Sequence, residues 1–207
     1  MDALPVDPTG LLAIAAGLGW ASGLRLYAVV FLTGLAGHLG WIELPTGLAL
    51  LQSPVMLGAS GFMLLLEFFI DKIPGLDSLW DLLHTLIRIP AGAALAAGVF
   101  GGDHASWALA AALMGGTLAA TSHLAKTTTR AAANASPEPF SNVGLSLAGD
   151  GVVPASLWLS WTHPVLFFIA LAFALVAMVA VVVWFARFLR RLGRRVSEWF
   201  GAARPSL

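Results

Sequence analysis

Four acidic side chains lie close together between residues 67 and 88, in a chain that is otherwise strongly apolar. Glu67 and Asp71 are four residues apart, as are Asp77 and Asp81, and this spacing puts each pair on one face of a helix. Clustered carboxylates attract cations, and ligation by oxygen alone suits Mg²⁺, Ca²⁺ or Mn²⁺. Two close carboxylates can also relay a proton. No specific metal motif is matched, so the alternative is that these acids pair with neighbouring bases at the membrane boundary.

A second motif, basic and hydroxylic, follows about forty residues later. His123, Lys126, Thr127, Arg130 and Asn134 are spaced so that they share one face of a predicted helix. Lysine, arginine and threonine could hold an anionic group such as a phosphate or a carboxylate. The alternative, which we favour, is that Lys126 and Arg130 neutralise acids of the first motif. That pairing requires the two motifs to pack together and form a polar centre near the cytoplasmic side.

Other polar side chains are predicted to lie near this centre. Arg25 is alone near the middle of the first apolar segment and needs an acceptor, for which Glu67 is the nearest candidate in depth. Glu138, in a loop with two prolines, could complete the centre. The predicted site consists of Glu67, Asp71, Asp77, Asp81, Lys126, Thr127, Arg130, Asn134 and Glu138, with Arg25, His84, Arg88, His123, Asn142 and Asp150 as further candidates.

The composition is that of a membrane protein. Of 207 residues, 58% are hydrophobic and 11% are charged, and the mean hydropathy is +0.86, whereas a soluble domain is about half apolar and about a quarter charged. We therefore predict an all-α polytopic membrane protein with one transmembrane domain, 1–186, and a cytoplasmic tail, 187–207. The chain has no cysteine, which excludes disulfides, thiolate metal sites and a thiol nucleophile.

Apolar segments recur along the whole chain. Segment 143–161 is interrupted by Gly149-Asp150-Gly151 and by Pro154, so we predict either a broken span or a re-entrant loop there. A loop is predicted before it, at 131–142. The order of the segments fits two inverted halves of three segments each. The six segments are 9–37, 54–70, 90–101 with part of an amphipathic helix at 76–89, 105–125, 143–161 and 164–184.

The basic residues predict the orientation. With six crossings, both termini lie in the cytoplasm on the same side as Lys72, Arg88, Lys126 and Arg130, and the outer connectors carry no lysine or arginine. This agrees with the positive-inside rule, whereas five crossings would put these bases outside. The protein is expected in a bacterial inner membrane. Its tail, with five arginines between 187 and 195, is predicted to be a basic amphipathic helix that lies on anionic lipid rather than binding nucleic acid.

The two motifs also resemble those of a known family. Over about residues 10–185 the chain is similar to domain-of-unknown-function family 4126, which consists of bacterial integral membrane proteins. Members carry a Glu-Asp pair near the end of the second motif, where this chain has Gly149-Asp150. The resemblance implies a compact multi-span protein and supplies no substrate. It rests on Glu67, Asp71, Lys72, Ile73, Pro74, Asp77, Ser78, Trp80, Asp81, Thr85, Arg88, Ala91 and Gly92, and on Lys126, Thr129, Arg130, Asn134, Ser136, Pro137, Glu138, Pro139, Phe140, Ser141 and Asn142.

We expect a small transporter or channel that binds an ion or small solute at the polar centre. One alternative is a membrane-embedded enzyme that acts on a lipid headgroup, although no nucleophile elbow, zincin or P-loop pattern is present. Another is a non-catalytic scaffold. The expected partners are membrane lipid and a small ion or solute, with no nucleic acid, and a homo-oligomer is left open. A hard divalent cation is the one cofactor that the acids suggest.

Overall fold

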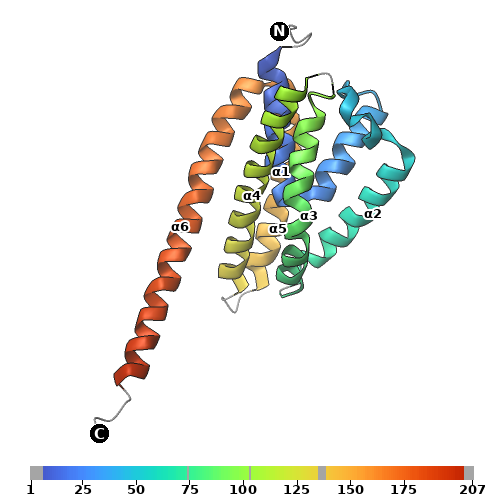
Figure 1. Ribbon diagram of the computed structural model, residues 1–207. Helices are drawn as coiled ribbons and strands as arrows, with labels where there is room; N and C mark the ends of the chain where they lie inside the picture. The colour runs from blue at the N-terminus through green and yellow to red at the C-terminus, as the bar shows by residue number, and fades with distance from the viewer. Residues whose placement is uncertain (1–6, 74, 103, 135–138, 203–207) are drawn as a thin grey trace.

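The computed structural model describes residues 7–73, 75–102, 104–134 and 139–202, and in these ranges every regular element is a helix. Figure 1 shows the helices as a bundle around α1, with α6 leaning away from it. The elements are α1 (Pro8–His38), η1 (Thr46–Gln52), α2 (Pro54–Ile70), α3 (Leu76–Gly98), α4 (Ala105–Asn134), α5 (Pro139–Thr162) and α6 (Pro164–Ala202).

Most of these helices suit a lipid environment. Among the described residues, α1, α4, α5 and α6 are long and apolar enough to cross a membrane, and η1 with α2, bent by 69°, adds a fifth if the two form one span. Large apolar side chains such as Phe173 and Val176 are exposed on α6, which water would disfavour over so wide a surface. The chain is therefore an all-helical polytopic membrane protein, as predicted.

Two helices predicted to be interrupted are continuous. Leu76–Gly98 is one helix with Pro90 inside it, and Pro139–Thr162 is one helix with Pro154 inside it. The prediction of a broken or re-entrant segment at 143–161 is therefore wrong, as is most of the predicted loop at 131–142. A proline inside a membrane helix is tolerated because neighbouring helices and local adjustments compensate for the lost hydrogen bond.

The interrupted helix is α1, which changes direction at Arg25. The backbone of Arg25 (φ −148°, ψ 84°) is not helical. Before this point α1 runs beside α4, so closely that a Cβ on Gly19 would lie 2.4 Å from Gly115 Cα and a Cβ on Gly23 would lie 2.1 Å from the Ala119 carbonyl oxygen. The first half of α1 therefore follows α4 from its beginning towards its end.

The second half of α1 returns towards the start. A Cβ on Gly61, in the middle of α2, would lie 3.0 Å from the Phe31 ring, and a Cβ on Gly34 would lie 2.3 Å from the carbonyl oxygen of Leu51 in η1. Figure 1 shows both ends of α1 at the same end of the bundle. Each half is shorter than the roughly 20 residues that a crossing needs. The predicted span at 9–37, although long and apolar enough for one crossing, thus folds back on itself at Arg25; we call this hairpin re-entrant.

The two ends of the bundle differ in charge. The start of α1, η1, the end of α3 and the end of α5 lie at one end, which we call the N-terminal end. The ends of α2, α4 and α6 lie at the opposite, C-terminal end (Figure 1). Lys72, Lys126, Arg130 and the arginines of α6 belong to the C-terminal end, and the described connectors at the N-terminal end have neither lysine nor arginine. This arrangement differs from the prediction of six crossings with both termini on one side.

The two predicted halves also have different elements. α1 is re-entrant while α4 is not interrupted, and the seven-residue η1 stands where the second half has the long helix α5. The inverted repeat is not visible in this arrangement. The predicted basic tail continues α6 without a break to Ala202.

Candidate functional site: a buried polar centre

Ten ionisable side chains meet where the apex of α1 reaches the C-terminal end of the bundle. Five are acidic and five are basic, and all except Lys72, Lys126 and Asp150 are buried. Burying a charge costs several kcal/mol unless it is paired, so such a set requires mutual neutralisation. We call these residues the polar centre: Arg25, Glu67, Asp71, Lys72, Asp77, Asp81, Arg88, Lys126, Arg130 and Asp150.

Asp77 and Asp81 are positioned by the start of α3. Gly75 (φ +89°) adopts a left-handed conformation that favours glycine, and it turns the chain from α2 into α3. Asp77 Oδ1 then accepts hydrogen bonds from the backbone N–H of Gly75 (2.8 Å) and of Ser78 (2.7 Å). Asp77, Asp81, His84 and Arg88 are all buried, which agrees with the helical face predicted from their spacing.

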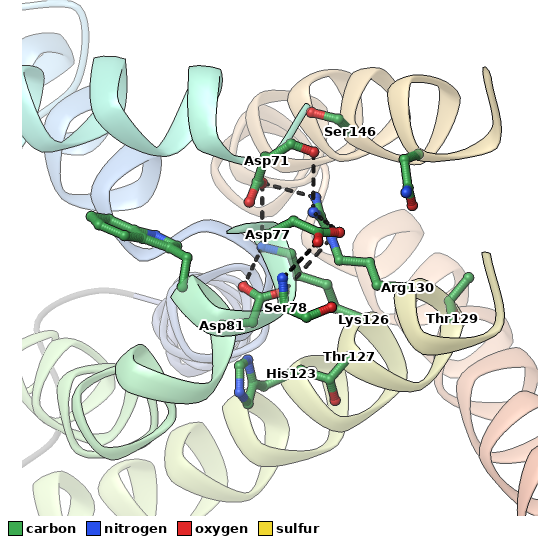
Figure 2. Close-up of polar contacts among 12 residues, drawn as sticks. Asp71, Asp77, Ser78, Asp81, His123, Lys126, Thr127, Thr129, Arg130 and Ser146 are labelled. Carbon is green, nitrogen blue, oxygen red and sulfur yellow. Dashed lines mark hydrogen bonds and ion pairs between the residues drawn. The ribbon is translucent and has the colours of Figure 1, made fainter. Parts of the chain in front are cut away.

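Asp71 is the counter-ion of three bases. Its Oδ2 lies 3.2 Å from Arg25 Nη2, 3.4 Å from Lys126 Nζ and 3.0 Å from Arg130 Nη2. Figure 2 shows Asp71 facing the basic side chains of α4. Because Asp71 follows α2 directly, this one carboxylate joins α1, α2 and α4.

The bases of α4 also pair with the acids of α3. Lys126 Nζ lies 2.9 Å from Asp81 Oδ1, and Arg130 Nη1 lies 3.0 Å from Asp77 Oδ2 (Figure 2). The two motifs therefore pack together as predicted. Asn134 extends the contact by donating to Asp77 Oδ1 (3.2 Å).

Arg88 forms ion pairs with two buried acids of the centre. It reaches Glu67 Oε1 at 2.5 Å through Nη2 and Asp81 Oδ1 at 2.6 Å through Nη1, and all three side chains are buried. Since Asp81 also contacts Lys126, each of these charges has its partner inside the protein.

Arg25 bonds to α5 as well as to Asp71. Its Nη2 lies 3.0 Å from Asp150 Oδ1 and donates to Ser146 Oγ at 2.9 Å and to the Ser146 carbonyl at 3.1 Å. Glu67, the partner predicted from depth, is instead bonded to Arg88. Sequence reasoning missed Ser146 and Lys72, although Asn142, Ser146 and Asp150 are spaced four residues apart on one helical face.

Other predicted residues lie at the edge of the centre. Asn142 donates to Asn134, and His84 stacks on Trp80 with ring centroids 4.0 Å apart. Thr127 donates to the Leu124 carbonyl of its own helix. Glu138 lies outside the described residues.

His123 is hydrogen-bonded to a hydroxyl but is not part of a catalytic triad. Its Nε2 lies 2.7 Å from Thr85 Oγ1, and its Nδ1 lies 3.4 Å from Arg88 Nη1. A triad of the Ser-His-Asp type has a carboxylate at the other ring nitrogen, where this site has a guanidinium.

Every acid of the polar centre is paired with a base. In the described ranges no group of three or more His, Asp or Glu side chains could hold a metal ion. Each of the five acids has a lysine or arginine nitrogen within 3.0 Å. The hard divalent cation that the acids suggest therefore stays a prediction.

Two cavities reach the polar centre. One, of about 490 Å³, lies between α3 and α4 and is lined by Asp81, Thr85, His123 and Arg130 among others. The other, of about 270 Å³, lies between α1, α4, α5 and α6 and includes Arg25, Lys126 and Arg130 in its lining. A small molecule or ion could thus contact the charged groups from either cavity.

Among the comparisons with known proteins, only the one with protein families finds a match. The family described as "Domain of unknown function (DUF4126)" matches residues 12–184, which is most of the chain. No curated protein and no solved structure matches.

Proposed function

The chain belongs to the DUF4126 family, and we propose that it is a small transporter or channel whose ion or solute binds at the polar centre. The interruption of α1 at Arg25 is the observation that carries this proposal. Non-helical backbone at membrane depth is tolerated only against protein or a wet cavity. Discontinuous helices that end near the middle of the membrane form the solute and ion sites of many transporters.

In the polar centre one carboxylate can contact several bases, and this sharing supports an exchange of ion-pair partners. Asp71 contacts Arg25, Lys126 and Arg130, and Lys126 in turn contacts Asp81. When a carboxylate of such a set is protonated, its bases keep part of their neutralisation through other acids. Protonation would therefore release a base for an anionic solute without leaving a wholly unpaired buried charge, and we propose it as the coupling step.

The proposed orientation puts this centre near the cytoplasmic face of a bacterial inner membrane. Helices α2 to α6 would make five crossings, with α1 dipping in from the outer side. The bases Lys72, Lys126 and Arg130 would then lie inside, as the positive-inside rule requires. The N-terminus would be outside and the C-terminus cytoplasmic.

An enzyme acting on a lipid headgroup is the less supported alternative. The closest approach to a nucleophile and base is Thr85 with His123, and the third group there is Arg88 rather than a carboxylate. A non-catalytic scaffold would explain the ion pairs, but it would not explain why a helix is interrupted at the polar centre.

Flux across vesicles tests the proposal. We expect purified protein in liposomes to admit protons, read by entrapped pyranine under a valinomycin-clamped potassium potential, with chloride, acetate or phosphate as the accompanying anion. Glu67→Gln should reduce this flux to that of protein-free vesicles, because it removes an acid bonded to Arg88.

The matched control is Glu43→Gln, the same chemical change at an exposed glutamate on the other end of the bundle, and it should leave the flux unchanged. Retention of native elution and helicity would show that Glu67→Gln still folds. No flux from the unaltered protein with any of the three anions, or equal flux from both variants, would overturn the proposal.

A further inference from the structure

A long apolar groove leads away from the basic part of the polar centre. The cavity of about 270 Å³ described above adjoins a second cavity of about 260 Å³, since Trp20 and Val152 line both. The remaining walls are largely apolar and come mainly from α5 and α6. We call this the α5–α6 groove; it is lined by Leu145, Ala148, Ala155, Leu159, Phe167, Leu171, Ala174, Ala177, Met178 and Val181 among others.

The groove is long and open to the side. From Phe167 to Val181 it follows α6 for 14 residues, which is about 21 Å of helix. Val152 and Val181 are 44% and 39% exposed, so its edge faces the surroundings of the bundle, which in a membrane are lipid chains. An acyl chain could enter laterally without crossing a polar surface.

One end of the groove is lined by three basic side chains of the polar centre. Arg25, Lys126 and Arg130 line it there, and all three share Asp71 as a counter-ion. Gly149 leaves room beside the guanidinium, since a Cβ at this position would lie 3.4 Å from Arg25 Nε. Each base also contacts a second acid, Asp150, Asp81 or Asp77, so an anionic ligand at this end would bind by exchange with carboxylates of the centre.

Two buried donors near the groove have unused hydrogen-bonding capacity. Within the described residues, Arg25 Nη1 and Trp20 Nε1 have no hydrogen-bond partner, and both side chains are at least 95% buried. Buried donors without a partner are costly, so a ligand atom that accepts from them would be stabilised.

We propose that the α5–α6 groove binds an amphiphile with one acyl chain and an anionic head. The head would lie against Arg25, Lys126 and Arg130, in competition with Asp71, and the chain would lie between α5 and α6. A carboxylate and a phosphate head share this chemistry. The proposal concerns binding alone and holds whether or not the protein transports a solute.

Binding to delipidated full-length protein in an uncharged detergent tests the proposal. Titration calorimetry would compare oleate, 1-oleoyl-lysophosphatidylglycerol and uncharged 1-oleoylglycerol, which share one chain. We expect at least one charged amphiphile to bind about ten-fold more tightly than the uncharged one. The order of the two charged amphiphiles would show whether a carboxylate or a phosphate head fits better.

Two adjacent residues of α6 provide matched variants. Ala177 lines the groove, whereas Val176 lies on another face of α6 and is exposed. Ala177→Phe should weaken binding of the charged amphiphile about ten-fold by filling the groove, while Val176→Phe should not change it. Val152→Phe fills the groove from α5 and serves if Ala177→Phe does not fold. Equal binding of charged and uncharged amphiphiles, or binding unaffected by the groove variants, would overturn the proposal.

Discussion

Asp71 and Asp150 both neutralise Arg25, but their surroundings differ. Asp71 is fully buried and contacts three bases, whereas Asp150 is 24% exposed and contacts Arg25 and Lys72. Removing one partner of a buried pair leaves an uncompensated charge, and its cost exceeds the energy that the pair itself contributes. A partly exposed carboxylate is hydrated, so its loss should matter less.

We therefore expect Asp71→Asn to lower the free energy of unfolding by about 3–5 kcal/mol. Asp150→Asn, the same change at the second partner of Arg25, should lower it by a small fraction of that amount, because Arg25 keeps Asp71. Unfolding of both variants in mixed micelles with increasing SDS, followed by circular dichroism, would measure the difference. Equal losses would show that Asp71 is not the main counter-ion.

For single residues, the sequence predicted that the two motifs pair with each other, but it did not predict the partner of Arg25. The spacing of Asp77, Asp81, Lys126 and Arg130 identified two charged faces, and opposite charges on faces this close to one membrane boundary had to meet. The partner of Arg25 could not be predicted in this way. Depth in the membrane is the same for several acids, and only the packing of α5 against α1 brings Asp150 and Ser146 to the guanidinium.

Small residues let α1, α3 and α4 approach each other. A Cβ on Gly92 of α3 would lie 2.7 Å from Ala119 Cβ of α4 and 3.3 Å from the Gly19 carbonyl of α1. Close approach through small residues is typical of membrane helices, where van der Waals packing replaces the hydrophobic effect as the source of association. This packing holds the first half of α1 on α4 and so fixes the position of Arg25.

Gly19→Ala should destabilise the protein by about 1–3 kcal/mol, since the new methyl group would collide with the Gly115 backbone. The control is Gly58→Ala in α2, where a Cβ meets nothing within 4 Å. That change should be neutral or stabilising by up to about 1 kcal/mol. Thermal unfolding in detergent would compare the two; a cost at both sites would point to a general effect of alanine.

Interruptions of helices were the least predictable elements. Pro154 and the glycines around Asp150 are local signals for a break, yet α5 is continuous. The break at Arg25 has no proline, and nearby Gly23 packs on α4 rather than ending the helix. The conformation of Arg25 depends on acids that are distant in sequence, so no local pattern could reveal it.

For the whole molecule, the re-entrant α1 decides on which side each connector lies. If α1 crossed the membrane, Thr9 and Glu43 would lie on opposite sides. Both are exposed, and the start of α1, which holds Thr9, lies at the same end of the bundle as η1, which follows Glu43 closely, opposite to the end of α6 (Figure 1). This also explains why counting crossings from apolar segments gave an even number, because a long apolar helix was taken for a span.

Single-cysteine variants can measure this arrangement, since the chain has no native cysteine. We expect Thr9→Cys and Glu43→Cys to react with a membrane-impermeant maleimide added to intact spheroplasts, and Arg190→Cys to react only after permeabilisation. The cysteine-free chain controls for background labelling. Reaction of Thr9→Cys and Glu43→Cys under opposite conditions would show that α1 crosses the membrane.

The apex of α1 has a consequence for biogenesis. Arg25 leaves the ribosome early, but its hydrogen bond to Ser146 spans 121 positions of the chain. Until α5 is synthesised, this guanidinium lacks two of its three partner residues, Ser146 and Asp150, and an arginine alone in lipid is strongly disfavoured. The N-terminal hairpin must therefore wait at the membrane surface or beside the translocon. The α1 hairpin is thus synthesised before α5 but reaches its final place only after it.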